Sequence, residues 1–272
     1  MTVELAAAMI QGWIFLFISE KGGVRKTATL GAFVAHLFEM MPAFPIFEID
    51  DQPRLKRWFG SDVSTLRLPA HDVVRHDDLA DQAALAPLLD SILDKVADNI
   101  AIDVAGSVDG RVLESMLKMD FCGAAVESGY RIAAFVPYTS ESDAIALASR
   151  TIERLSVALP GSLIVPVHAE DGGSLRHVTG NTAQRLSHIL KSGPQIRHPR
   201  ILPRALAAAE ATGVSPYHLA ALSDSEGRTL LFEKGLPRAL ARGIHSELVM
   251  WREEIRLEFD SLPLVPDDGA RS

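Results

Sequence analysis

Unbroken apolar runs alternate with longer helix-like segments along most of the chain. Residues 13–19 read WIFLFIS, a run rich in aromatic and β-branched residues that ends in a glycine-containing turn. A run without polar interruptions is typical of a parallel strand that is buried on both faces. Four similar runs predict further strands, at 45–50, 99–106, 131–137 and 162–168.

The segments between these runs favour helices. Helical patterns cover 27–40, 83–98 and 142–159. Strands that alternate with helices predict an α/β fold, in which a parallel, twisted sheet is flanked by helices on both faces. The chain shows no internal repeat and no low-complexity linker, so we expect one domain over residues 1–272, with a frayed tail at 263–272.

Composition narrows the class of protein. The 272 residues are 47% hydrophobic and 23% charged, which is ordinary for a globular chain with a sizeable core. The single cysteine, Cys122, cannot form an internal disulfide, so we expect a cytoplasmic protein. The apolar N-terminus lacks a basic region and is too short to span a bilayer, and the amphipathic segment 245–262 is rich in acids. We therefore expect no membrane association, and we expect segment 245–262 to pack on the domain.

The loop SEKGGVRKT, at 19–27, lies between the first predicted strand and the first predicted helix. A helix that begins at such a loop offers unpaired N–H groups to an anion. The glycines Gly22 and Gly23 allow close approach of the backbone, Lys26 would neutralise phosphate charge, and the Thr27 hydroxyl would ligate Mg²⁺. The alternative is a glycine-rich turn with two incidental lysines.

Two acids follow neighbouring predicted strands. Asp50 ends the strand at 45–50, and Asp103 lies near the end of the strand at 99–106. Because parallel strands end at the same edge of a sheet, both carboxylates should point into the crevice that holds the loop. Either acid alone would be interpreted as a solvated residue at the end of a strand. The two together, behind this loop, favour a nucleotide-binding site.

Through this loop and these two acids, the chain resembles the ParA/MinD group of P-loop ATPases. The loop KGGVRKT is similar to their deviant Walker A motif, KGGxxK[ST]. The segments EIDDQPRL (48–55) and AIDVAGS (101–107) resemble the two acidic motifs of the group, and 201–219 resembles its C-terminal stretch. The resemblance extends over about 13–222.

The resemblance implies ATP and Mg²⁺ as cofactors and assigns roles to individual residues. Lys21 corresponds to the signature lysine that reaches the nucleotide of a partner subunit, and Asp50 to the acid that places the metal or the attacking water; these two are the catalytic candidates. Gly106 corresponds to a switch glycine that senses the γ-phosphate. The nucleotide-binding candidates are Lys21, Gly22, Gly23, Val24, Arg25, Lys26, Thr27 and Ala28, and the metal candidates are Thr27, Asp50 and Asp103.

Three features depart from the family pattern. Arg25 stands where the family has glycine, and a side chain on a tightly curved loop costs on the order of 1–3 kcal/mol in strain. Its guanidinium could recover that cost on a phosphate. In DDQP (50–53) the second acid and the proline do not occupy the positions that they have in the family's Asp-x-Asp-Pro-Gln motif. His168 lies where relatives carry an asparagine for adenine.

Charge is unevenly distributed along the chain. There are 27 lysines and arginines against 35 acids, a net charge of −8, yet no acid occurs between Asp171 and Glu210. That interval contains Arg197, Arg200 and Arg204, the candidate contacts to nucleic acid. It could equally form a solvated face or part of the nucleotide pocket.

The leading hypothesis is a ParA/MinD-like protein that binds ATP·Mg²⁺, closes a homodimer through Lys21 and hydrolyses ATP slowly. Such a switch would act in the partition or transfer of plasmids or DNA, with DNA or a DNA-bound adaptor as partner. One alternative is a degenerate, non-hydrolysing scaffold in a larger assembly. Another is a metabolic P-loop enzyme with a small-molecule pocket.

Overall fold

The computed structural model of the chain describes residues 12–50 and 54–264, and its centre is a seven-stranded sheet. Every strand pair is parallel, and the strand order is β3-β2-β4-β1-β5-β6-β7. The strands are β1 (Gly12–Ile18), β2 (Ile46–Ile49), β3 (Val63–Leu66), β4 (Asn99–Val104), β5 (Tyr130–Tyr138), β6 (Leu163–Ala169) and β7 (Ile196–His198). The predicted fold class is confirmed.

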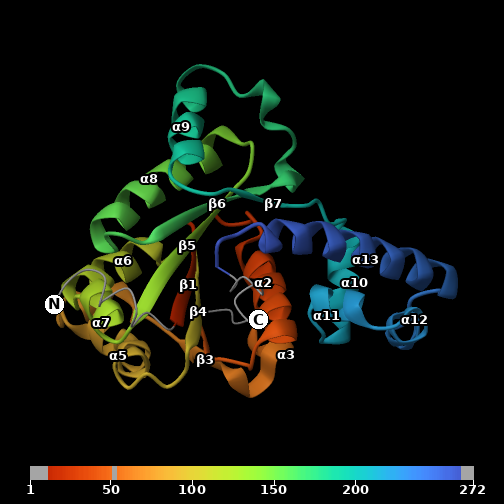
Figure 1. Ribbon diagram of the computed structural model, residues 1–272, viewed down its shortest axis with the longest axis horizontal. Helices are drawn as coiled ribbons and strands as arrows, with labels where there is room; N and C mark the ends of the chain where they lie inside the picture. Colours follow the sequence, from red (N-terminus) through yellow and green to blue (C-terminus); the bar gives the residue numbers. More distant parts are fainter. Residues whose placement is uncertain (1–11, 51–53, 265–272) are drawn as a thin grey trace, which may run out of the picture.

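Helices cover both faces of the sheet (Figure 1). One face carries α2 (Lys26–Met40), α3 (Lys56–Phe59), α10 (Pro203–Thr212), α11 (Pro216–Ala221), α12 (Asp224–Glu233) and α13 (Arg238–Asp260). The other carries α5 (Ala80–Leu93), α6 (Asp109–Lys118), α7 (Phe121–Glu127), α8 (Ser142–Ala158) and α9 (Gly180–Lys191). The short helix α4 (His71–Val74) precedes α5.

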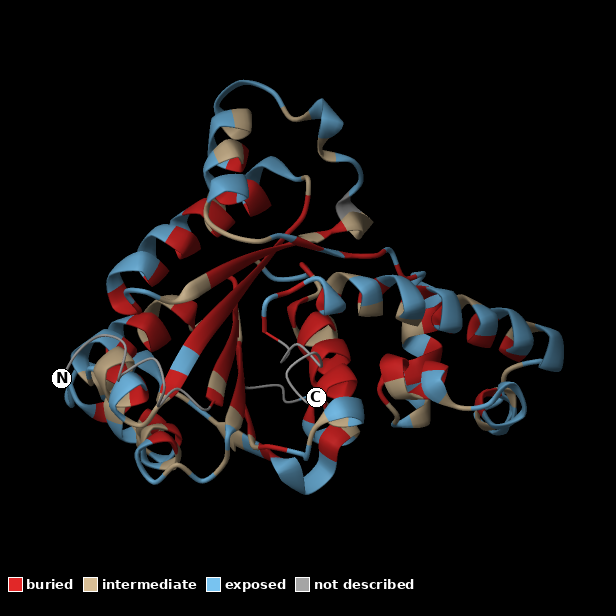
Figure 2. Cartoon of the chain, viewed as in Figure 1, coloured by how far each residue is buried: buried red, intermediate tan, exposed pale blue. Residues whose placement is uncertain are grey.

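Alternate side chains of the central strand β1 belong to two separate hydrophobic cores, one on each face of the sheet. Phe15 and Phe17 of β1 pack towards α2, whereas Ile14, Leu16 and Ile18 pack towards α5–α8. All five are at most 1% exposed, which explains why this strand is apolar at every position. Figure 2 shows the same burial through the strands and α2. This packing fixes the end of β1, and with it the loop that follows.

The two strands that the sequence did not predict lie at the edges of the sheet. β3 has four residues and β7 three, and both include polar or exposed positions. An edge strand needs only one neighbour and one apolar face, so it leaves little hydrophobic signal. The helix expected over 83–98 instead ends at Leu93, where Lys95 adopts a left-handed conformation with φ 47°.

The C-terminal helices pack on the face of the sheet that carries α2. The prediction that segment 245–262 packs on the domain is confirmed, because Leu248, Trp251, Ile255 and Phe259 of α13 lie in that core. Leu264, within the tail expected to fray, is also buried, and residues 265–272 lie outside the described part.

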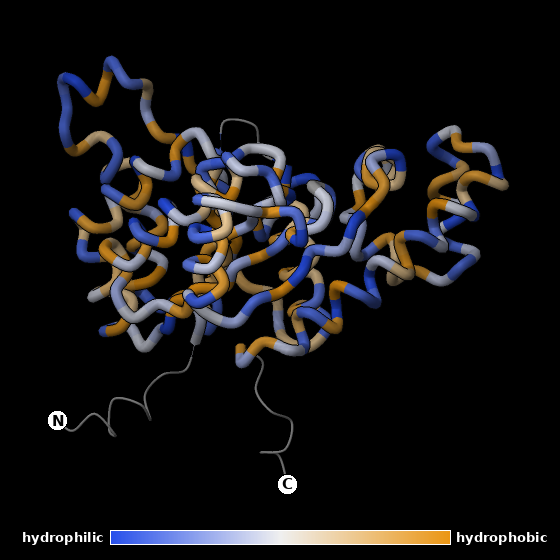
Figure 3. Tube along the Cα trace, turned by 90° about the horizontal axis from the view of Figure 1, so that it is seen from above, coloured by the Kyte–Doolittle hydropathy of each residue, from blue (hydrophilic) through white to orange (hydrophobic). Residues whose placement is uncertain are grey.

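Helix α12 and the adjoining end of α13 form an arm at the side of the molecule (Figure 1). Seen from above, hydrophobic and hydrophilic residues are interleaved along this arm rather than gathered into one apolar surface (Figure 3). Within the described residues, none of the helices has the length and apolar character needed to cross a membrane.

Candidate functional site

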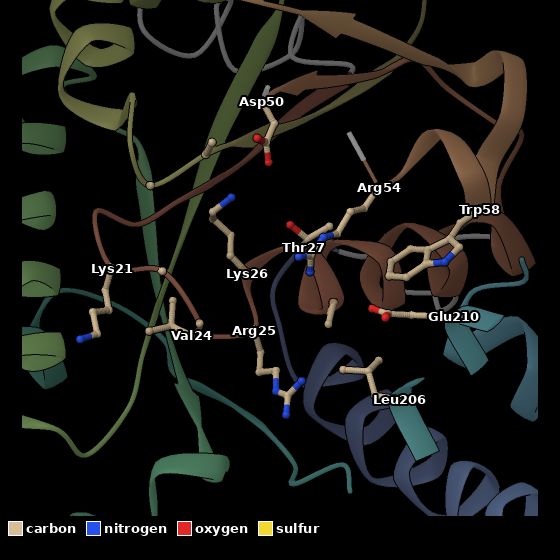
Figure 4. A pocket seen from close by; sticks show the side chains of 15 residues that line it. Lys21, Val24, Arg25, Lys26, Thr27, Asp50, Arg54, Trp58, Leu206 and Glu210 are labelled. Atoms are coloured by element: carbon tan, nitrogen blue, oxygen red, sulfur yellow. The ribbon is translucent and has the colours of Figure 1, made fainter. Parts of the chain in front are cut away.

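The loop between β1 and α2 lies at the carboxyl edge of the sheet, beside its central strand. Gly23 has φ +79°, a conformation that favours glycine, and a Cβ at Gly22 or Gly23 would meet nothing within 4 Å. Lys26 is the first residue of α2, so the loop presents the unpaired N–H groups of a helix N-terminus. A cavity of about 280 Å³ opens over it, lined by Lys21, Gly22, Gly23, Val24, Arg25, Lys26, Thr27, Ala28, Asp50, Arg54, Trp58, Ala105, Gly106, Leu206 and Glu210 (Figure 4).

Lys26, Thr27 and Asp103 contact one another beneath this cavity, and we call them the inner cluster. The Lys26 ammonium donates to one oxygen of Asp103 at 2.6 Å, and the Thr27 hydroxyl donates to the other at 2.7 Å. The side chains of Lys26 and Asp103 are 9% and 1% exposed. The inner cluster thus joins a cation, a hydroxyl and a carboxylate at the N-terminus of a helix.

These donors fit a magnesium ion. A hydroxyl and a carboxylate are hard oxygen ligands, and Mg²⁺ is commonly held by one or two protein oxygens together with water and phosphate oxygens. Among the described residues there is no group of three or more histidine, cysteine or acidic side chains that could hold a metal without a substrate. Thr27 and Asp103 would therefore hold the ion jointly with a phosphate.

Asp50 and Gly106 lie where the sequence predicts them. Asp50 follows β2, lines the cavity, and points towards it from the side opposite Arg25 (Figure 4). Gly106 follows β4, and a Cβ there would come within 2.8 Å of the Glu20 carbonyl oxygen and 2.9 Å of the Ser19 carbonyl oxygen. Glycine is thus required for β4 to end against the start of the loop.

A buried acid that the sequence analysis missed supports the same wall of the cavity. Glu48 of β2 is 1% exposed and is the register partner of Asp103 across the sheet. One of its carboxylate oxygens accepts the backbone N–H groups of Arg54 at 2.6 Å and Leu55 at 3.0 Å. Burial raises the pKa of Glu48 above its ordinary value. This side chain thus fixes the backbone at Arg54, which lines the cavity.

Lys21 points away from the inner cluster (Figure 4). Its ammonium donates to the Asp143 carboxylate and lies 3.7 Å from Glu141, both at the start of α8. The hydrogen bond to Asp143 raises the pKa of Lys21 and lowers the pKa of Asp143. In the isolated chain, Lys21 is thus held by carboxylates 120 or more residues away.

Arg25 adopts the left-handed conformation that the family pattern reserves for glycine, with φ 61° and ψ 20°. The strain expected from the sequence is therefore present. The guanidinium, however, forms an ion pair with Asp171, which follows β6, rather than projecting freely over the loop. Without nucleotide, the partner of Arg25 is thus a carboxylate of the same chain, and its contact with a phosphate stays a prediction.

His198 lies close to this pair and carries no hydrogen bond on either ring nitrogen within the described residues. It is completely buried, and burial lowers its pKa to about 4, opposed by the charge of Asp171 and reinforced by that of Arg25. His168, in the position of the family's asparagine, is half-buried beside Tyr138 and does not line the cavity.

Solved structures share this architecture. A ParA family ATPase from Chlorobium tepidum TLS aligns with a TM-score of 0.50 and 12% identity, over 89% of this chain and 98% of that chain. A chain of the MinC:MinD cell division protein complex of Aquifex aeolicus aligns with a TM-score of 0.50 and 15% identity, over 93% of this chain and 99% of that chain. The chain has the ParA/MinD fold. No protein-family model and no curated protein matches the sequence.

On this ParA/MinD fold, the three candidate nucleic-acid contacts lie in different settings. Arg197 donates to Glu258 of α13 at 2.8 Å from its Nε and also lies 3.6 Å from Glu170. Arg200 and Arg204 are exposed, and neither forms an ion pair with a described residue. The basic interval is therefore partly neutralised at Arg197 by acids from outside it.

The sequence analysis did not name the residues at the far end of the cavity, although segment 201–219 contains two of them. This end is formed by Arg54 and Trp58, from the segment after β2, and by Leu206 and Glu210 of α10. About 150 residues separate these two walls, so no local pattern could bring them together. The available signals were a tryptophan in the segment LKRWFG and the resemblance of 201–219 to the family's C-terminal stretch.

Proposed function

We propose that this chain is a ParA/MinD-like ATP-binding protein and a slow ATPase that acts as an ATP-dependent dimerisation switch. The inner cluster carries the proposal. It places a lysine, a hydroxyl and a carboxylate together at the N-terminus of α2, which is the chemistry that a triphosphate with a divalent cation requires.

In this proposal Lys26 would leave Asp103 and neutralise the β- and γ-phosphates of the nucleotide. Thr27 and Asp103 would then hold Mg²⁺. The bound ion would neutralise the charge that develops on the phosphate oxygens. Asp50, at the edge of the cavity, would orient the metal or the attacking water.

The dimer would form when Lys21 leaves Asp143 and Glu141 for the phosphates of the partner's nucleotide. Both acids are exposed, so the exchange requires no change in the core. Slow hydrolysis would follow from Arg25, because a side chain on the loop restrains its rearrangement. We place the protein in the cytoplasm, where the switch would serve the partition or transfer of plasmids or other DNA. Its partner would be DNA or a DNA-bound adaptor.

A second candidate is a non-hydrolysing scaffold that keeps the fold and acts by binding alone. The observation that favours it is Arg25, which closes one side of the loop against Asp171. If this pair persists with nucleotide present, the loop cannot rearrange during hydrolysis.

Light scattering with ATP·Mg²⁺, ADP·Mg²⁺ and no nucleotide tests the switch. We expect the mass to double with ATP alone and the Lys21→Ala variant to stay monomeric while still binding ATP. Lys118→Ala is the matched control, because Lys118 is an exposed lysine that likewise pairs with an acid, Glu114. A wild-type protein that stays monomeric with bound ATP would leave the scaffold as the better account.

A further inference from the structure

Four cationic side chains line the cavity over the loop: Lys21, Arg25, Lys26 and Arg54. The first three are each bound by a carboxylate of the same chain. The Arg54 guanidinium, in contrast, forms no ion pair or hydrogen bond with any residue of 12–50 or 54–264. Arg54 can therefore meet an anion in the cavity without first leaving an acid.

The backbone at Arg54 is fixed on both sides, although the side chain is exposed. One carboxylate oxygen of Glu48 accepts the N–H groups of Arg54 at 2.6 Å and Leu55 at 3.0 Å. The Arg54 carbonyl accepts the N–H of Arg57 at 3.1 Å, and the Leu55 side chain is completely buried in the core that includes α2. An arginine on such a backbone loses less freedom when it binds a ligand than one on a mobile loop.

Glu48 is itself held at a set place in the sheet. It lies in β2 between Thr65 of β3 and Asp103 of β4, its register partners, and it is 1% exposed. Its acceptor oxygen therefore has a defined position beside the inner cluster. The register that places Glu48 next to Asp103 thus also sets the position of Arg54 relative to the loop.

Arg54 faces the part of the cavity where the last phosphate of a nucleotide would lie. Figure 4 shows its side chain extending from the segment after β2 towards Thr27, on the side of the cavity away from Lys21. Thr27 is the proposed magnesium ligand, and Asp50, on the same segment as Arg54, would orient the metal or the attacking water. A guanidinium suits this place, because its parallel N–H groups match two oxygens of one phosphate.

We propose that Arg54 is a further phosphate-binding residue, whose guanidinium contacts the terminal phosphate of a bound nucleoside triphosphate, and that Glu48 positions it. Lys26 neutralises the phosphates from the loop, and Arg54 does so from the segment after β2. The contact distinguishes a triphosphate from a diphosphate, so it links the state of the nucleotide to that segment. The inference rests on the proposed function, because the loop must first hold the phosphates.

Calorimetric titrations with the Mg²⁺ complexes of ATP, ADP and tripolyphosphate test the contact. Arg54→Ala should bind ATP and tripolyphosphate about tenfold or more weakly than the wild type, because a charge-assisted hydrogen bond is lost. Its affinity for ADP should equal that of the wild type, since ADP lacks the third phosphate. Arg54→Lys keeps the charge without the planar fork and should recover part of the loss.

Arg57→Ala is the matched control for this series. Arg57 is also exposed and lies three residues further along the chain, but it does not line the cavity. This variant should bind all three ligands as the wild type does. Circular dichroism and thermal melting establish that each variant is folded.

Glu48 has its own signature as a positioning residue. Glu48→Gln keeps an oxygen that can accept both N–H groups, so it should retain the wild-type ratio of ATP affinity to ADP affinity. Glu48→Leu has no acceptor, so this ratio should fall towards that of Arg54→Ala. In the Arg54→Ala background, Glu48→Leu should not lower the ratio further. A merely structural role would weaken both nucleotides and leave the ratio unchanged.

The possible failures are distinguishable. If Arg54→Ala binds ATP as the wild type does, or loses ATP and ADP equally, the inference falls, while the proposed function stands because the wild type binds ATP. A loss of ATP with unchanged tripolyphosphate would place Arg54 at the base or sugar and would also overturn it. An unchanged ratio in Glu48→Leu would remove Glu48 from the account. If the wild type binds neither ATP nor tripolyphosphate, the proposed function itself fails.

Discussion

The inner cluster and the outer ion pairs of the same loop are built in opposite ways. Inside, Lys26, Thr27 and Asp103 are closely packed, and one carboxylate serves both partners. Outside, Arg25 is bound by Asp171, a residue 146 positions further along the chain, and Lys21 by acids of α8. The inner contacts bury charge, whereas the outer ones lie where solvent and ligands can reach them.

This difference separates contacts that the fold cannot lose from ion pairs that can be exchanged for a ligand. Breaking the inner cluster leaves a buried charge unpaired, so the protein should require a replacement cation there. Exposed ion pairs contribute little to stability, so Lys21 can leave Asp143 for a phosphate at small cost. Arg25 lies between these cases, because its ion pair is half-buried and its backbone is strained.

Removing one partner of the inner cluster should have the largest effect on stability. Lys26→Ala leaves the Asp103 carboxylate buried and unpaired, so we expect the free energy of unfolding to fall by about 3–5 kcal/mol. Urea unfolding measures this loss. The double variant Lys26→Met with Asp103→Asn removes both charges and should recover much of it. A double variant that is less stable than Lys26→Ala would show that the loss does not come from the unpaired Asp103 charge.

His198, beside the outer pair of Arg25 and Asp171, predicts a pH dependence. Its folded pKa of about 4 lies below the ordinary value near 6.5, so the unfolded chain takes up a proton more readily than the folded one. Stability should therefore be complete above about pH 6.5 and fall as the pH drops towards 4, with about 2 kcal/mol lost by pH 5.

His198→Phe keeps an aromatic ring in the core and should reduce this pH dependence without removing it, because burial also lowers the pKa of His36, His168 and His218. Urea unfolding at pH 7.5 and pH 5 measures the change. His76→Gln, at an exposed histidine, is the control and should leave the profile unchanged. If His198→Phe shows the wild-type dependence, the buried imidazole is not its source.

Arg25 allows strain and ion pairing to be separated. Arg25→Gly removes the left-handed strain and the pair with Asp171, whereas Arg25→Ala removes the pair and keeps the strain. The glycine variant should be the more stable of the two by about 1 kcal/mol in urea unfolding. It should also turn over ATP at least as fast as the wild type. Indistinguishable stabilities for glycine and alanine would mean that the loop relaxes around any residue.

The same contrast between bound and unbound cations applies to the basic interval. If Arg200 and Arg204 contact DNA, replacing both with alanine should reduce the salt dependence of binding by about one power of salt concentration for each lost phosphate contact. Arg197→Ala should have the smaller effect, because Glu258 and Glu170 already neutralise it. Fluorescence anisotropy with a DNA duplex, with and without ATP, measures both. A slope that stays unchanged when Arg197, Arg200 and Arg204 are all replaced by alanine would exclude this surface.

The parts of the molecule that the sequence could predict are local in the chain. Unbroken apolar runs such as 13–19 predicted five of the strands, and the loop and its two acids were placed correctly at one edge of the sheet. The edge strands were missed because three or four partly polar residues give no clear period.

Contacts between distant segments were also beyond local patterns. Nothing near Arg25 indicated that Asp171 would bind it, and nothing near Trp58 indicated that α10 would face it. Glu48 was missed because an acid within a strand is ordinarily read as solvated, and only the register beside Asp103 shows that it is buried.

Calorimetric titration of ATP·Mg²⁺ into the wild type and into Lys26→Ala tests the central claim most directly. We predict saturable binding at one site per chain for the wild type. Lys26→Ala should bind at least tenfold more weakly, because the cation that neutralises the phosphates is gone. Folding of the variant is checked at the same temperature. No binding by the wild type, or equal affinity in both proteins, would contradict the account.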